Sequence, residues 1–147
     1  MSGRIEETNR PTAVGLANGV SFCVYISGVE KRKVIATLKE RYPDRAITFI
    51  HVLVFTVLLY YVLQPHIERL ALVTIDLEYT GHDALIKNRV LTLLHNAGLR
   101  AEKEQLAIGR VGKKSPSHEL AYGVYAGKRK PDRVLTAADV LVLIRGK

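Results

Sequence analysis

The chain has 147 residues, of which 48% are hydrophobic and 24% charged, a composition that excludes a disordered protein and allows one hydrophobic core. Its formal net charge of +8 favours nucleic acid, an anionic membrane or an acidic protein as the partner. Cys23 is the only cysteine, which excludes an intrachain disulfide and a cysteine-based zinc site. Because the N-terminus carries no secretory signal, we expect a reduced, cytoplasmic protein.

The first third of the chain begins with a polar segment and then becomes apolar. Residues 1–18 show no sustained period, so we expect a flexible N-terminal arm ahead of a single domain over residues 19–147. Residues 20–27 are rich in aromatic and β-branched side chains and predict a strand. Residues 34–41 allow two interpretations, because their apolar side chains fit a half-exposed strand and also a short helical stripe.

Residues 46–64 form the most apolar segment and contain no Asp, Glu, Lys or Arg. Residues 47–50 favour a strand, and residues 52–63 favour a buried helix because they are apolar nearly all round. The segment approaches the roughly 20 residues that span a bilayer, so a membrane anchor is the alternative. We prefer a core element, because the rest of the chain alternates like an α/β domain whose strands need cover on both faces.

The second half of the chain has clearer boundaries. Residues 70–76 predict a buried strand, and Thr80 with Asp83 has the spacing of a capping box at a helix start. Gly98 stands where a helix C-terminus is expected, and Ser115 followed by proline predicts another helix start. The remaining expected elements are a strand over residues 105–111, a basic loop over residues 127–133 and a capped helix over residues 137–144.

An acidic pair, Asp76 and Glu78, stands at the end of the buried strand. Alternate residues of a strand point to the same side, so the two carboxylates should face one way. The carboxyl ends of strands are where open α/β sheets bind ligands, and carboxylates suit metal ligation or acid–base chemistry. The structural alternative is that both residues cap the following turn or pair with surface lysines.

With residues 34–41 taken as a strand, the order is three strands, helix, strand, helix, strand, helix. This order resembles that of the ribonuclease H-like superfamily, which includes Holliday-junction resolvases. The resemblance implies an α/β fold in which helices flank a mixed sheet. Residues 24–28 (Val-Tyr-Ile-Ser-Gly) look like its first strand, and Val-Thr-Ile-Asp ending at Asp76 looks like the strand that carries its central metal ligand. The loop and helix over residues 111–121 look like the place where the family supplies another acidic ligand.

The resemblance implies catalysis with Mg²⁺ or Mn²⁺, held by several carboxylates. In this chain Ser27 occupies the position of the family's first-strand aspartate, and His118 and Glu119 fall near the final acidic position. Only Asp76 matches at its own position. The expected site is therefore Asp76 and Glu78 as metal ligands, with His118 as ligand or general base; a solvent-facing His118 is the alternative.

Basic residues supply candidate phosphate contacts. Lys113, Lys114 and Ser115 precede a predicted helix N-terminus, where backbone N–H groups favour an anion, although a solvated loop explains them equally well. The densest basic run either contacts phosphate or only solubilises the chain, and it comprises Lys128, Arg129, Lys130 and Arg133. Two tyrosine pairs could stack on bases, although the first looks more like core: Tyr60 with Tyr61, and Tyr122 with Tyr125.

The sequence therefore predicts a metal-dependent nuclease-like or resolvase-like protein that acts on nucleic acid. It lacks the P-loop, dinucleotide-binding, zincin and nucleophile-elbow motifs, so those chemistries have no support. The alternative is a non-catalytic basic binding or assembly module for nucleic acid or protein, and a homodimer or larger assembly is compatible with either function. A small membrane-anchored protein is the third interpretation.

Overall fold

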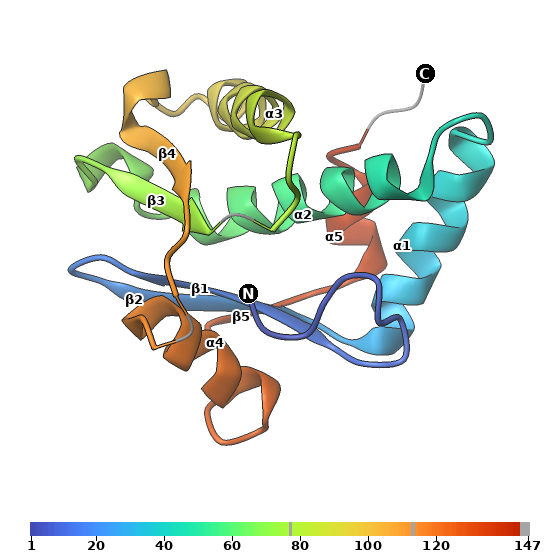
Figure 1. Cartoon of the computed structure of the whole chain (residues 1–147), viewed down its shortest axis with the longest axis horizontal. Helices are drawn as coiled ribbons and strands as arrows, with labels where there is room; N and C mark the ends of the chain where they lie inside the picture. Colours follow the sequence, from blue (N-terminus) through green and yellow to red (C-terminus); the bar gives the residue numbers. More distant parts are fainter. Residues whose placement is uncertain (77, 113, 145–147) are drawn as a thin grey trace.

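The computed structural model describes residues 1–76, 78–112 and 114–144. Over these residues the chain is an α/β protein with five α-helices and two small sheets, one three-stranded and mixed, the other two-stranded and parallel (Figure 1). The helix α2 runs through the middle, with the larger sheet on one side and α3 on the other (Figure 1).

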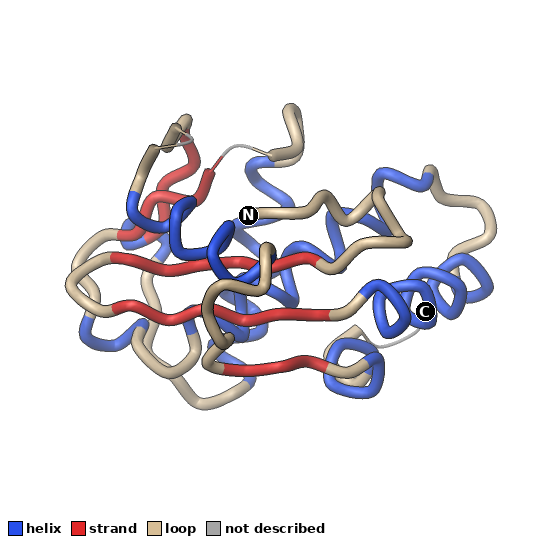
Figure 2. Tube along the Cα trace, turned by 90° about the horizontal axis from the view of Figure 1, so that it is seen from below, coloured by secondary structure: helices blue, strands red, loops and turns tan. Residues whose placement is uncertain are grey.

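The larger sheet has the order β1-β2-β5, and its three strands lie side by side in Figure 2. The strands β1 (Thr12–Ala17) and β2 (Ser21–Ile26) form an antiparallel hairpin, and β5 (Arg133–Leu135) runs parallel to β2. The predicted strand over residues 20–27 is confirmed. The predicted arm over residues 1–18 was wrong, because it contains β1 and because Ile5 is fully buried.

The larger sheet is covered on both faces, which explains why β1 is buried despite its weak sequence pattern. The helix α4 (Pro116–Tyr125) packs on one face, and α2 (Ile47–Leu63) packs on the other. A Cβ atom added at Gly15 would lie 2.7 Å from the Ser117 carbonyl oxygen, so the close approach of α4 to β1 requires glycine there.

The smaller sheet pairs β3 (Val73–Asp76) with β4 (Leu106–Gly109), so that Asp76 lies opposite Gly109. Among the described residues no ladder joins β1 to β3; instead, Asn18 Nδ2 donates a hydrogen bond to the Leu72 carbonyl oxygen at 2.6 Å. The clear five-stranded sheet of ribonuclease H is therefore not formed, and Figure 2 shows the two-stranded sheet set apart.

The strand interpretation of residues 34–41 was wrong, because these residues belong to the helix α1 (Gly28–Arg41). Ser27 caps this helix by accepting a hydrogen bond from the Glu30 backbone N–H at 3.2 Å. The buried side chains of α1 have helical spacing, and they are Lys31, Val34, Ile35 and Leu38.

The apolar segment is a single helix, α2, so the predicted strand over residues 47–50 was wrong and the predicted helix over residues 52–63 is confirmed. The helix α2 contacts α1, α3, α5, β1 and β2. Because neighbouring elements surround it, its surface is apolar nearly all round and has no polar stripe. No helix in the described part of the chain is long and apolar enough to cross a bilayer.

The remaining helices follow local signals with one exception. The helix α3 (Asp83–Asn96) begins after His82 and not at Thr80, so the predicted cap at Thr80 was wrong. Gly98 ends α3 with φ +80°, as predicted. Ser115 caps α4, and Thr136 forms the predicted capping box of α5 (Ala137–Leu141) with Asp139. Two short 3₁₀ turns complete the fold, η1 (Ile67–Arg69) and η2 (Lys103–Gln105).

Candidate functional site

The acidic pair lies where the sequence places it, at the carboxyl end of β3. Asp76 is the last residue of β3, and Glu78 follows it by two residues. Burial, followed by the proximity of the Asp76 carboxylate, raises the pKa of Glu78, while the Met1 amino group and Arg4 oppose the rise. The two carboxyl groups therefore lie close enough for each to influence the other.

Asp76 also has a structural role, as the alternative interpretation of the acidic pair expected. Its Oδ1 accepts a hydrogen bond from the Val111 backbone N–H at 3.2 Å. This bond fixes the loop between β4 and α4 against the end of β3. The Asp76 carboxylate therefore orients the segment that leads to α4, in addition to lining the cavity described next.

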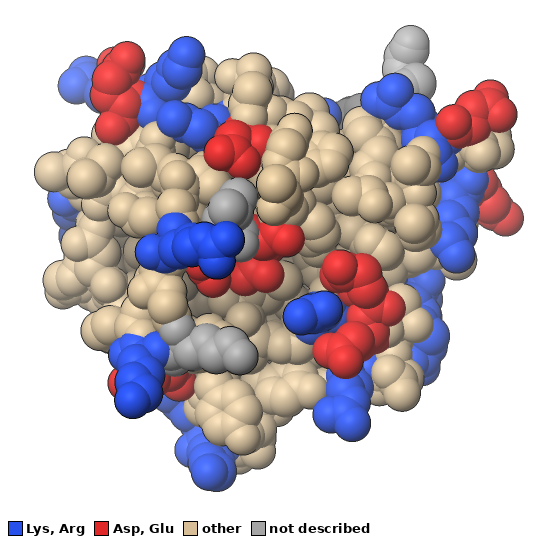
Figure 3. Space-filling view, viewed as in Figure 1, with Lys and Arg blue, Asp and Glu red and all other residues tan. Residues whose placement is uncertain are grey.

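A polar cavity of about 630 Å³, here called the outer cavity, opens beside the acidic pair. Its lining includes the acidic pair together with Arg4, Arg110 and His118. Figure 3 shows acidic atoms near the middle of this face with cationic groups directly beside them. The structure thus brings His118 to the same cavity as Asp76 and Glu78.

His118 does not complete a metal-ligand cluster with the acidic pair. Within the described ranges, no group of three His, Cys, Asp or Glu side chains could together hold a metal ion. The His118 backbone N–H donates to Ser115 Oγ at 3.3 Å, which places His118 in the first turn of α4. Its side chain is half-buried at the cavity wall, a position suited to proton transfer.

A second, largely apolar cavity of about 290 Å³, here called the inner cavity, lies between β1, β3 and α2. Its wall includes Leu16, Phe55 and Leu59. Asp76 and Glu78 line both cavities, so the acidic pair stands between an apolar interior and a polar opening. This position explains why burial is the largest cause of the raised pKa of Glu78.

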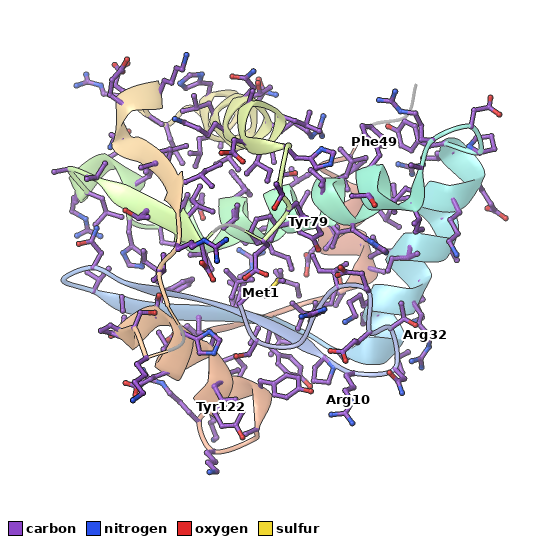
Figure 4. All side chains as sticks on the ribbon, in the orientation of Figure 1. Met1, Arg10, Arg32, Phe49, Tyr79 and Tyr122 are labelled. Carbon is purple, nitrogen blue, oxygen red and sulfur yellow. The ribbon has the colours of Figure 1, made fainter. Side chains whose placement is uncertain are left out.

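The N-terminal segment forms one wall of the outer cavity, where Met1 is seen above β1 in Figure 4. Lys31 is fully buried, and its Nζ donates to the Arg4 carbonyl oxygen and to Thr12 Oγ1, both at 2.9 Å. On the other side, the Tyr79 hydroxyl donates to Glu6 Oε1 at 3.2 Å. These bonds fix the backbone that carries Arg4.

Arg4 and Arg110 were not predicted as site residues. Arg4 lies in the segment that was expected to be a flexible arm, so nothing local marked it. Arg110 carried a usable signal, because it directly follows β4, and the ends of adjacent parallel strands meet at one edge.

The predicted phosphate-binding residues lie in three places: before α4, in the loop after α4, and on β5. Before α4, Lys113 lies outside the described residues, Lys114 is exposed, and Ser115 caps the helix. Lys128, Arg129 and Lys130 are exposed on the loop that follows α4.

Arg133 lies apart from the other predicted phosphate ligands. Its guanidinium carbon lies 4.4 Å from the centroid of the Tyr61 ring, a cation–π contact on the α2 face of the sheet. Tyr61 itself is buried, which confirms that this tyrosine belongs to the core.

Comparisons of the chain with protein-family models, curated proteins and solved structures find no match. The class of protein is therefore argued from the site itself. The fold and the site define a basic α/β protein with two neighbouring carboxyl groups in a cavity that arginines also line.

Proposed function

We propose that the protein is a metal-dependent nuclease-like enzyme acting on nucleic acid. One observation carries this proposal: Asp76, Glu78 and His118 line a single cavity together with two arginines. Carboxylates supply metal ligands, arginines hold phosphate oxygens, and an imidazole transfers protons. Each of these groups can contribute to phosphodiester cleavage.

The acidic pair is a suitable donor set for Mg²⁺ or Mn²⁺. Mg²⁺ keeps several waters and commonly binds through one or two carboxylates plus substrate phosphates, so Asp76 and Glu78 suffice as protein ligands. The negative charges of Asp76 and Glu78 oppose each other, and a divalent cation bound between them would relieve this repulsion. When bound, the cation neutralises phosphate charge and lowers the pKa of a coordinated water.

The remaining residues have roles that follow from their positions. Arg4 and Arg110 stand at the wall of the outer cavity, where a phosphate approaching the acidic pair would meet them. His118 lies at the same wall from α4 and would give or take a proton at the scissile phosphate. Ser27, in place of the family's first-strand aspartate, caps α1 and contributes no ligand.

A second function, binding of nucleic acid without turnover, is favoured by the distribution of charge. The chain has 22 Lys and Arg, yet in the described part of the structure Lys33 and Glu30 form the one ion pair. Lys31 is buried, but most of the other described lysines and arginines are exposed and can contact phosphates, which is what a binding module requires.

The test is cleavage of end-labelled single-stranded, duplex and RNA–DNA hybrid oligonucleotides with Mg²⁺, Mn²⁺ or EDTA. We expect cleavage that requires the metal and that falls at least about 100-fold in Asp76→Asn and Glu78→Gln. Asp76→Asn keeps an acceptor for the Val111 N–H, and Asp83→Asn, an exposed acid at the start of α3, is the matched control.

Unchanged cleavage by Asp76→Asn would show that the proposed site is wrong. Binding without cleavage by the wild-type protein on every substrate would support the binding module instead. A metal readout independent of activity is the thermal midpoint, which Mg²⁺ should raise in the wild-type protein and not in Glu78→Gln.

A further inference from the structure

A third cavity, of about 550 Å³ and here called the basic groove, lies at the surface beside the outer cavity. Tyr25 of β2 and Tyr125 of α4 line it, together with the loop over residues 127–131 and Val134 of β5. Tyr125 also lines the outer cavity. Tyr125 therefore borders both cavities, and the surface from the acidic pair past Tyr125 to the basic loop is here called the path.

The helix α4 provides the aromatic side of this path. His118, Tyr122 and Tyr125 are spaced as i, i+4 and i+7, which places them along one face of the helix. Tyr122 is 52% exposed, and its ring centroid lies 6.3 Å from that of Tyr125. Arg10 donates from Nη1 to the Tyr125 hydroxyl at 3.2 Å, and Figure 4 shows Arg10 and Tyr122 on the same side of the larger sheet.

Hydrogen bonds fix the backbone of the loop after α4, which carries three exposed cations. The backbone N–H groups of Lys128 and Arg129 both donate to the Gly123 carbonyl oxygen, at 2.9 and 3.1 Å. The nearby carboxylate of Asp132 accepts a hydrogen bond from the Cys23 backbone N–H at 2.8 Å and is thereby engaged with β2. Over the described residues, Lys128, Arg129 and Lys130 form no ion pair.

We infer that this path binds a single strand of nucleic acid and leads its backbone to the acidic pair. The inference rests on the proposed function and names the substrate class of that same site. The phosphates would lie on Lys128, Arg129 and Lys130, and unpaired bases would stack on Tyr122 and on the Tyr25 side of the basic groove.

The exposed apolar and aromatic surface is what favours a single strand over a duplex. Val134 is 60% exposed at the basic groove, and Tyr122 is more than half exposed beside it. A duplex presents phosphates and base edges, whereas an unpaired strand presents the flat faces of its bases. Exposed rings beside clustered cations therefore match the surface of an unpaired strand.

The test is fluorescence anisotropy of Asp76→Asn, without divalent metal, with a labelled oligothymidylate or oligouridylate of about 20 nucleotides and with a duplex of equal length. This variant separates binding from cleavage. In this background, Tyr122→Ala should weaken binding of the single strand roughly tenfold, since stacking is worth about 1–3 kcal/mol per base. The triple variant Lys128→Gln, Arg129→Gln, Lys130→Gln should reduce the slope of log K against log salt by about 2, at about 0.7 per phosphate contact.

A matched triple variant removes three exposed cations elsewhere, and its members are Lys39→Gln, Arg100→Gln and Lys103→Gln. It should leave the salt slope unchanged. Tighter binding of the duplex would overturn the inference while leaving nuclease activity on duplex possible. Equal competition by polyglutamate would also overturn it, because the surface would then recognise only a polyanion. Absence of binding to either oligonucleotide would overturn the inference, whereas the proposed function is decided separately by the cleavage assay with the wild-type protein and metal.

Discussion

Lys31 gives a test of the N-terminal wall that does not depend on any activity. Its side chain is fully buried in α1, where it donates to the Arg4 carbonyl oxygen and to Thr12 Oγ1. Burial lowers the pKa of Lys31 from 10.5 to about 8, against the opposing charges of Glu7 and Glu6. At about 1.4 kcal/mol for each pKa unit, the buried ammonium costs the folded state about 3 kcal/mol.

The sign of the pH dependence follows from this lowered pKa. Below about pH 8 the lysine is protonated in both states, so the folded state carries the whole cost. Between about pH 8 and 10.5 the unfolded chain binds more protons, so the free energy of unfolding rises with pH. Relative to Lys31→Met, which cannot titrate, the wild-type protein should gain about 2 kcal/mol between pH 7.5 and 9.5.

The measurement is urea unfolding of the wild-type protein and Lys31→Met at several pH values in this interval. The difference between the free energies of unfolding of the two proteins does not depend on the tyrosines and other titrating groups that both contain. Lys39→Met, an exposed lysine on the same helix, is the control and should show no such change. A constant difference between the wild-type protein and Lys31→Met across the interval would refute the reasoning about this buried charge.

Three further predictions concern other parts of the fold. Gly15→Ala should lower the free energy of unfolding by about 2 kcal/mol or more in urea titrations, because its Cβ would collide with the backbone of α4; a neutral effect would contradict the close approach. Thr136→Ala should cost about 1 kcal/mol in the same assay by removing the capping box with Asp139, and no loss would mean that α5 does not depend on its cap. Burial, followed by the charge of Asp132, raises the pKa of Cys23 to about 12, so its thiol should react with a disulfide reagent at pH 8 only after unfolding. Rapid labelling of the native protein would contradict that burial.

Local signals predicted the elements that begin or end with a definite cap. Ser115 with the following proline marked α4, and Thr136 with Asp139 marked α5. Two short segments were assigned wrongly. Residues 34–41 allowed a strand or a helix and residues 47–50 favoured a strand, and packing against other elements makes both of them helical.

Non-local pairing explains the other errors. The strand β5 is three residues long and follows a basic loop, so its place in the sheet depends on β2 and not on its own sequence. The acidic pair was predictable because Asp76 and Glu78 stand at the end of a predicted buried strand, although β3 itself ends at Asp76. Arg4 was not predictable, because it reaches the site only after Lys31 fixes the N-terminal segment.

The separation of β1 from β3 divides the site between two sheets. Asp76 belongs to the smaller sheet, whereas His118 belongs to a helix that packs on the larger one. Over the described residues the two sheets share no strand ladder, and Asn18 reaches across the gap with one side-chain hydrogen bond. One hydrophobic core contains side chains from both sheets, among them Leu16 of β1 and Ile75 of β3. The distance between the acidic pair and His118 therefore depends on side-chain packing in this core and not on a strand ladder.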